Sequence, residues 1–279
     1  MKYVIIVLIL IAVEGLGQEI YPPLSHKGSI EQMVGNIQFE IVYERPSARG
    51  REIFGGLVPY GQPWRTGASY CTTVSFDGPV TIANKMIPAG EYALVTVPDE
   101  EEWSIRLNLD HEMYGTYDYD STEDVVSFTV PVRKSNRYYE TVTIDLDVIP
   151  NNLMVYISWT NVQVAFEIET GIDAEVMDHI KNSVDVAEQS DPQELAMAAD
   201  YLYFQNQELE MALQLANRSL TLDPDGWSRN VILLLHQRMG NDELALDFAQ
   251  ASLKYKRKQQ DSEEIERWLE IVDQLKQRE

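Results

Sequence analysis

Apolar and polar residues alternate along much of the first 170 positions of the chain. In the segment NIQFEIVYE, residues 36–44, apolar side chains occupy every second position, with Gln38, Glu40 and Glu44 on the opposite face, as in a strand with one buried side. Further short segments rich in Val, Ile, Thr and aromatic residues follow, separated by turn sequences such as Asp77-Gly78. Without helical segments between them, these strands predict an all-β sandwich or jelly-roll-like domain over residues 18–170.

After Gly171 the apolar residues recur at the spacing of a helix. The positions that carry this pattern are Ile172, Val176, Ile180, Val184 and Ala187. Asp191-Pro192 with Glu194 is typical of a helix start, since it offers an N-cap, a proline in the first turn and a capping glutamate. The chain is therefore predicted to be α+β with the two types segregated, and residues 171–279 form its helical region.

The helical region contains an internal repeat. The segments ALQLANRSL, residues 212–220, and ALDFAQASL, residues 245–253, share Ala, Leu, Ala, Ser and Leu at matching places 33 residues apart. This period resembles that of tetratricopeptide-type helical hairpins, which is about 34 residues. Only about two such units fit, so we expect a short tetratricopeptide-like region with a face for a protein partner.

The last segment, DSEEIERWLEIVDQLKQRE, predicts an amphipathic helix over residues 261–279. Its apolar side chains share one side, and they are Ile265, Trp268, Leu269, Val272 and Leu275. Such a stripe indicates packing against the preceding hairpin, and a docking face for a partner is the alternative.

The first 17 residues have the features of a secretory signal. Lys2 precedes an apolar run from Tyr3 to Val13, and small residues predict cleavage before Gln18. A retained anchor is the alternative, but we expect no stable membrane insertion once the signal is removed. The single cysteine, Cys71, cannot form an intramolecular disulfide, which favours export in a bacterium, to the periplasm or the exterior.

The chain is strongly acidic, with 45 Asp and Glu against 22 Lys and Arg and a net charge of −23. The acidic excess is shared by both predicted regions, so nucleic acid and anionic lipid are not expected partners. The sequence has no phosphate loop, dinucleotide fingerprint, paired-cysteine zinc site or nucleophile motif, and we predict neither a metal nor a cofactor. The acidic segment DYDSTED could bind calcium, but solvated surface is the favoured interpretation. His111 could act as a metal ligand or an acid–base group, but a loop position without such a role is favoured.

One basic segment stands out against this acidity. Between Arg45 and Phe76 the only acid is Glu52, whereas glycine, proline, arginine and aromatic residues are frequent. Arginine pairs well with carboxylates and aromatic rings can form a flat apolar wall, so the segment is a candidate site for an anionic or sugar-like ligand. The candidate residues are Arg45, Arg51, Tyr60, Trp64, Arg65 and Tyr70. The alternative is a scaffold loop in which the arginines cap carbonyls and pair with acids.

The segment YERPSARGREIFGGLVPYGQPWRTGA, followed by IPAGEYALVTVP and EWSIRLN, closely resembles the bacterial domain of unknown function (DUF) 2911 family. The resemblance covers roughly residues 24–168. It implies an all-β domain on an exported protein, often followed by helical repeats, and it brings no established reaction or ligand. The chain departs from the family pattern at Ser69 and Tyr70, where Asn and an acid are expected, and at Tyr114, where Trp is expected.

Together these features predict an exported, non-enzymatic binding or assembly module of the bacterial envelope. The alternative is a hydrolase or lyase that acts on glycans through an Asp/Glu pair, which the sequence does not locate. A pair of carboxylates in a cleft beside Arg65 and Tyr60 would favour the enzyme, and a closed apolar loop would favour the scaffold.

Overall fold

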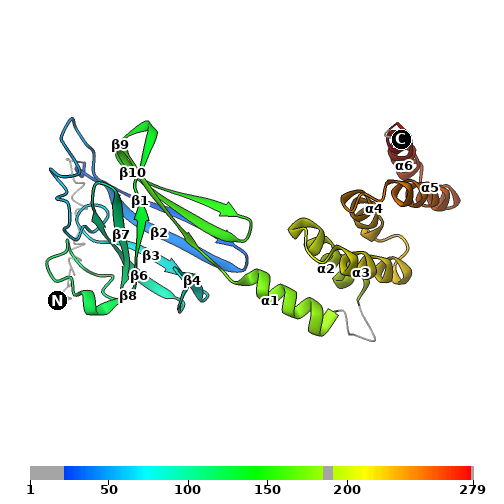
Figure 1. Ribbon diagram of the computed structural model, residues 1–279, viewed down its shortest axis with the longest axis horizontal. Coiled ribbons are helices and arrows are strands. Elements are labelled where there is room, and N and C mark those ends of the chain that lie inside the picture. The colour runs from blue at the N-terminus through cyan, green and yellow to red at the C-terminus, as the bar shows by residue number, and fades with distance from the viewer. Residues whose placement is uncertain (1–21, 185–190, 278–279) are drawn as a thin grey trace, which may run out of the picture. The chain divides into compact units, whose positions relative to one another are not determined.

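The computed structural model describes residues 22–184 and 191–277, and the chain divides into two compact units between Ile172 and Asp173 (Figure 1). Strands make up the first, which we call the β unit, and helices make up the second, the helical unit. The predicted segregation of strands and helices is thus confirmed. The predicted signal segment 1–17 and Ala187 lie outside the described residues. Within the described ranges, no helix combines the length and apolar character needed to cross a membrane.

The larger sheet of the β unit has six strands in the order β1-β2-β3-β6-β7-β8, and every neighbouring pair is antiparallel. The order follows the chain except where β4 and β5 leave the sheet. The strands are β1 (His26–Val34), β2 (Ile37–Arg45), β3 (Thr72–Phe76), β6 (Gly90–Pro98), β7 (Glu102–Asn108) and β8 (Asp124–Pro131), and the 3-10 turn η1 (Ser121–Glu123) precedes β8.

Two hairpins form the second layer. They are the long pair β9 (Arg133–Ile149) and β10 (Asn152–Ile168), and the short pair β4 (Val80–Ile82) and β5 (Lys85–Ile87). Thr81 and Glu169 exchange backbone hydrogen bonds of 2.8 and 2.9 Å, which join the short hairpin to the end of β10.

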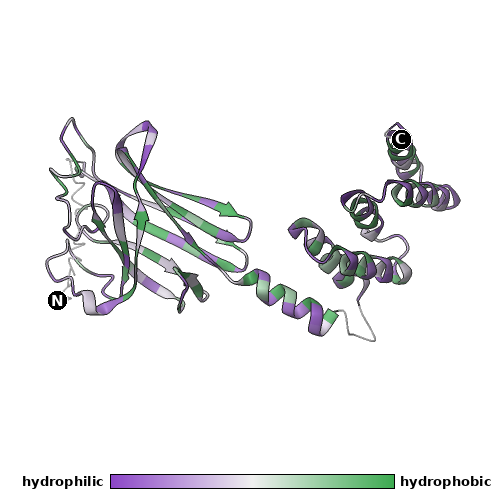
Figure 2. Ribbon diagram, in the orientation of Figure 1, coloured by the Kyte–Doolittle hydropathy of each residue, from purple (hydrophilic) through white to green (hydrophobic). Residues whose placement is uncertain are grey.

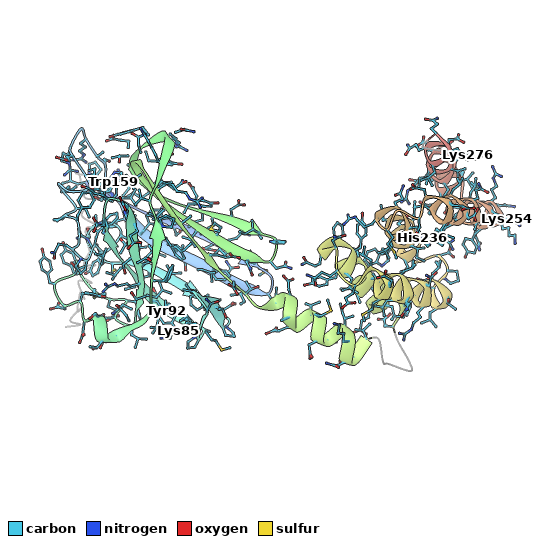
Figure 3. All side chains as sticks on the ribbon, viewed as in Figure 1. Lys85, Tyr92, Trp159, His236, Lys254 and Lys276 are labelled. Carbon is cyan, nitrogen blue, oxygen red and sulfur yellow. The ribbon has the colours of Figure 1, made fainter. Side chains whose placement is uncertain are left out.

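β10 reverses its direction near Thr160, whose φ is +54°. An extended strand of this length would separate its two ends by about 50 Å. The two ends of β10 instead lie side by side, as two hydrogen bonds between them show. Asn152 Nδ2 donates to Glu167 Oε1 at 2.8 Å, and Thr170 Oγ1 donates to the Asn151 carbonyl at 2.6 Å. The reversal leaves Trp159, the residue before it, at one end of the β unit, where Figure 3 labels it.

The two layers enclose one hydrophobic core, and apolar and polar residues alternate along the strands that face it (Figure 2). The face predicted for the first alternating segment is confirmed, because Ile37, Phe39, Ile41 and Tyr43 are all buried. Trp103 of β7 and Trp159 of β10 are the largest fully buried side chains of this core.

The helical unit consists of short helices that pack as neighbours. They are α1 (Ile172–His179) with a π-helical turn η2 (Ile180–Val184), α2 (Pro192–Gln205), α3 (Leu209–Leu222), α4 (Ser228–Arg238), α5 (Asp242–Gln259) and α6 (Ser262–Lys276). The predicted N-cap of α2 is confirmed, since the Asp191 side chain accepts from the Gln193 N–H at 2.9 Å. The predicted capping glutamate, Glu194, places its Oε1 3.1 Å from His179 Nε2.

The two copies of the repeat occupy equivalent environments on α3 and α5. Their shared small residues are buried, in the pairs Ala212 and Ala245, Ala216 and Ala249, and Ser219 and Ser252. Both serines make contacts to the start of α4, because Ser219 Oγ lies 2.5 Å from Ser228 Oγ and Ser252 Oγ accepts from Arg229 Nη1 at 3.2 Å. Small side chains at these positions allow the neighbouring helices to approach closely.

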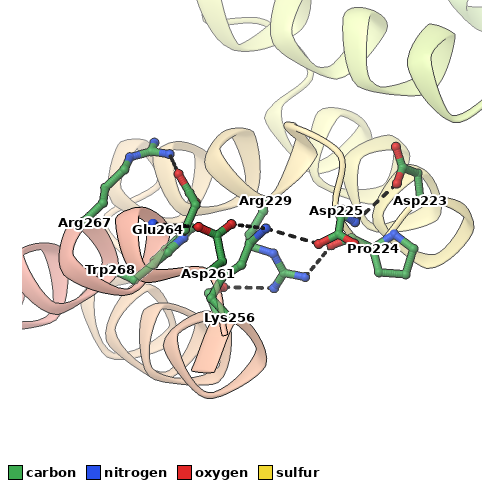
Figure 4. Close-up of polar contacts among 10 residues, drawn as sticks. Asp223, Pro224, Asp225, Arg229, Lys256, Asp261, Glu264, Arg267 and Trp268 are labelled. Carbon is green, nitrogen blue, oxygen red and sulfur yellow. Dashed lines mark hydrogen bonds and ion pairs between the residues drawn. The ribbon is translucent and has the colours of Figure 1, made fainter. Parts of the chain in front are cut away.

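Arg229 and Lys256 are two buried cations that connect α4 to α5 (Figure 4). Arg229 Nη2 donates to the Pro224 carbonyl at 2.8 Å, and its guanidinium lies 4.5 Å from the centre of the Tyr255 ring. Lys256 Nζ donates to Asp225 Oδ1 at 3.2 Å. The loop between α3 and α4 is therefore held by one side chain of α4 and one of α5.

His236 on α4 provides a pH-dependent term in the stability of the helical unit. Its Nδ1 is buried with no hydrogen-bond partner among the described residues, and burial lowers the pKa of the ring. In the unfolded chain His236 binds its proton with the ordinary histidine pKa of ~6.5. The contribution of the neutral ring to folding stability is therefore complete above that pH, and it is lost as the pH falls through the lower pKa of the folded state.

We therefore expect His236→Phe, which keeps a ring against Phe248, to flatten the fall in stability below about pH 6.5. Thermal unfolding followed by helical circular dichroism between about pH 5 and 8 measures this. His26→Gln, on the exposed part of β1, is the control. An equal acid response in wild type and His236→Phe contradicts the assignment.

Candidate functional site

The basic segment forms a long loop, residues 46–71, between β2 and β3. Part of it continues the large sheet, because Trp64 and Thr96 exchange backbone hydrogen bonds of 2.7 and 2.9 Å beyond the end of β3. Gly55 needs its glycine, since its φ is +84° and a Cβ there would lie 2.8 Å from Tyr60 Cε2. Trp64 and Arg65 thus both lie in this loop.

Trp64 belongs to an aromatic cluster that fastens the loop to the core. Its ring stacks on that of Trp159 with centroids 5.8 Å apart and an interplanar angle of 20°, and it meets Phe54 and Trp103 edge to face. Its Nε1 donates to the Gly67 carbonyl at 3.1 Å. Trp64 and Trp159 are only 7% and 1% exposed. The expectation that Trp64 forms an open wall is therefore corrected: most of its surface is core.

Three arginines of the basic segment are bound to neutral backbone and hydroxyl groups. Arg45 donates to the Val142 carbonyl at 2.9 Å and to two threonine hydroxyls of β9. Arg51 donates to the Ser47 and Ala48 carbonyls at 2.6 and 3.0 Å. Arg49 Nη2 donates to the Leu24 carbonyl at 3.1 Å. At these positions the scaffold alternative describes the structure, so Arg45 and Arg51 do not converge on a ligand pocket with Arg65.

Arg65 differs from the other arginines of the loop. Its Nε is buried, and no hydrogen bond or ion pair reaches its guanidinium from residues 22–184 or 191–277. A buried charged donor without a partner costs about 1–3 kcal/mol or more, so it calls for a physical explanation. Arg65 is held through its backbone, since its carbonyl accepts from the Thr72 N–H at 3.1 Å.

Arg65 lines a groove of about 230 Å³ that contains no acid, and we call it the Arg65 groove. Its remaining lining is Pro46, Leu57, Val58, Pro59, Gln62, Pro63, Trp64, Gly67, Ala68 and Trp159. The reversal of β10 supplies Trp159, which is far from the rest of the lining in the sequence. A charged donor in an acid-free, mostly apolar hollow is suited to an anion.

The two candidate tyrosines lie elsewhere. Tyr60 faces an acidic turn, and the pKa of its hydroxyl is raised by partial burial and by Glu100, Asp99 and Glu52. Tyr70 is 62% exposed, packs edge to face on Tyr114 at 5.3 Å, and lines a different hollow. Of the six candidates, the structure thus brings only Trp64 and Arg65 together in one groove.

The second hollow, of about 380 Å³, is rich in carboxylates. It is lined by Lys27, Val42, Tyr43, Glu44, Tyr70, Cys71, Thr73, Glu91, His111 and Glu112. His111 Nδ1 lies 3.7 Å from Glu91 Oε2, so His111 has an acidic neighbour that its sequence position did not reveal. Burial raises the pKa of the Cys71 thiol to about 12, against the opposing charge of Arg65. The thiol is therefore protonated and unreactive at neutral pH.

A polar network that the sequence does not predict joins β7 and β8. Arg106 Nη1 donates to the Tyr119 hydroxyl, which donates to Asp124 Oδ2, both at 2.7 Å, and Asn108 Nδ2 donates to Asp124 Oδ1 at 2.9 Å. Burial, then the bond to Asp124, raises the pKa of Tyr119 to about 12. The Asp120 side chain caps η1 by accepting from the Thr122 N–H, so this acid of DYDSTED stabilises the turn. Among the described residues, no cluster of three or more His, Cys, Asp or Glu is placed to hold a metal ion.

Comparison with known proteins identifies the family of the β unit. The family model described as "Protein of unknown function (DUF2911)" matches residues 25–168, which is just over half of the chain. No curated protein and no solved structure matches the chain. The match ends at the last residue of β10, so it covers the β unit with both of its hollows. The chain belongs to the DUF2911 family.

Proposed function

We propose that this protein is an exported, non-enzymatic binding module of the bacterial envelope, which holds an anionic ligand in the Arg65 groove. The observation that carries the proposal is the Arg65 guanidinium, which no described residue binds, beside a groove without an acid. A ligand carboxylate in the groove would accept from the accessible part of the guanidinium and supply the missing negative charge. The N-terminal apolar segment supports export.

The helical unit would serve a protein partner as a short tetratricopeptide-like region. The matched burial of the two repeat copies supports this, because α3 and α5 use the same small residues in the same way. Such hairpins expose one face to a partner while they bury the other.

The glycan-acting hydrolase or lyase remains the second candidate, with one observation in its favour. The second hollow gathers Glu44, Glu91 and Glu112 beside His111 and Tyr70. The Arg65 groove, where the sequence placed the substrate, is lined by no carboxylate. An acid–base pair would therefore act in the second hollow rather than in the Arg65 groove.

A contrast between two arginines tests the proposal. Arg65→Gln is expected to abolish binding of anionic probes such as digalacturonate and acidic peptides. It should leave the melting temperature unchanged or raise it slightly, because no bond of the folded chain is lost. Arg45→Gln removes the same charge together with three hydrogen bonds, so it should lower stability by about 1–3 kcal/mol and keep the binding.

The measurements are thermal melts and calorimetric titration of each variant. A clear loss of stability in Arg65→Gln with no change in binding would show that Arg65 is a scaffold residue.

A further inference from the structure

The aromatic rings beside Arg65 are closed to a ligand. Trp64 and Trp159 stack on each other and bury nearly all of their surface in the core. A sugar ring packs against an aromatic face only where that face is open. The groove therefore lacks the platform that a carbohydrate would need.

The accessible wall is formed instead by aliphatic rings and chains. Pro46, Pro59 and Pro63 line the groove together with Leu57. Proline has no backbone N–H, so the side chains of Gln62 and Arg65 are the main hydrogen-bonding groups in the groove, too few to replace the bonds that several sugar hydroxyls make with water. Moving a hydroxyl out of water without a partner is unfavourable. An apolar chain with one carboxylate has a single polar group to move out of water. The positive charge of Arg65 offsets the cost of burying that carboxylate.

The size and charge of the surroundings limit the ligand further. A volume of about 230 Å³ is below the usual range for a whole small-molecule ligand, so it has room for one acidic side chain and its neighbour. The net charge of −23 opposes any densely acidic polymer. An isolated carboxylate on an otherwise uncharged chain fits both conditions.

We infer that the Arg65 groove binds a single Glu or Asp side chain of an extended polypeptide, flanked by proline or aliphatic residues. This inference rests on the proposed function and names the ligand of the same site. Extended proline-containing segments present side chains at low entropic cost and dock on grooves of this kind.

Three probes test the inference on the full mature chain. They are acetyl-Ala-Pro-Glu-Leu-Ala-amide, the same peptide with Gln in place of Glu, and digalacturonate. The Glu peptide should shift the NMR signal of the Arg65 Nε–H and bind about tenfold more tightly than the Gln peptide, because only the carboxylate accepts charge-assisted bonds. Digalacturonate should bind more weakly than the Glu peptide.

Two variants separate recognition by Arg65 from a general effect of charge. Arg65→Lys keeps the charge but loses the planar fork, and it should remove most of the preference for Glu over Gln. Arg137→Gln removes an equal charge from the exposed side of β9, outside the groove, and should leave the preference unchanged.

Each other outcome overturns a defined claim. Arg65-dependent binding of digalacturonate that is tighter than that of the Glu peptide overturns the peptide inference and keeps the proposed anion site. Equal binding of the Glu and Gln peptides also overturns the inference. No binding of any probe, with an unshifted Arg65 Nε–H signal, overturns the inference and the proposed function together.

Discussion

Trp159→Ala is expected to destabilise the β unit by about 3–5 kcal/mol, the usual cost of deleting a fully buried tryptophan. The ring stacks on Trp64 and meets Phe54 edge to face at 6.1 Å, and its Nε1 donates to the Glu140 carbonyl at 3.2 Å. The substitution therefore removes the contact that joins the β10 reversal to the loop at residues 46–71. Unfolding in urea, followed by the loss of β-sheet circular dichroism, measures the change.

A graded series makes this prediction specific. Trp159→Phe retains most of the ring contact and loses the hydrogen bond to Glu140. The loss of this bond should lower the free energy of unfolding by about 0.5–1.5 kcal/mol, and the smaller ring should add a lesser loss from packing. Tyr117→Ala is the matched control, because Tyr117 is 88% exposed and its loss should change little. A cost below about 1 kcal/mol for Trp159→Ala would show that the loop is held without the aromatic cluster.

The stability of this cluster and the binding by Arg65 are linked. The loop carries Arg65 on a backbone whose geometry depends on Trp64, and Trp64 is held by Trp159. Three neighbouring arginines secure other parts of the segment through carbonyl and hydroxyl acceptors. The scaffold and ligand interpretations of the basic segment thus apply to different residues of it, since Arg65 is the arginine of the segment whose guanidinium no described residue binds.

The strands and helices could be predicted because their periodicity is local. The alternation around Phe39 reflects one buried face, and the repeat at Ala212 and Ala245 reflects close helix packing. Both signals lie within a few residues of the structure that they specify.

The site could be predicted only in part because it depends on contacts between distant segments. Trp159 lines the groove because β10 reverses its direction at the next residue. The pair Thr160-Asn161 is the local indication of this reversal in the sequence. Tyr70 is five residues from Arg65, yet it lines the other hollow. Composition alone could count the arginines of the segment, but it could not show which of them already had acceptors.

The second large effect is expected at the C-terminal end of the chain, where the stripe predicted on the last helix packs against its neighbours. Trp268, Val272 and Leu275 of α6 are buried against residues of α4 and α5, which include Leu233 and Leu253. The packing interpretation is confirmed for these three side chains, whereas Leu269 of the same predicted stripe is exposed. Trp268 is fully buried, and its Nε1 donates to Glu264 Oε2 at 3.0 Å. We expect Trp268→Ala to cost about 3–5 kcal/mol.

The loss caused by Trp268→Ala should be confined to one end of the helical unit. The core around α2 and α3 is a separate cluster, built on residues such as Leu202 and Leu215, and it does not contain Trp268. Amide hydrogen exchange should therefore show α6 unprotected in Trp268→Ala while α2 and α3 keep their protection. Leu269→Ala, one position along and 36% exposed, is the matched control and should leave α6 protected. Equal loss of protection in α2 and α6 would mean that the helices unfold as one cooperative body, because a repeat whose neighbours are strongly coupled transmits the loss of one helix to all the others.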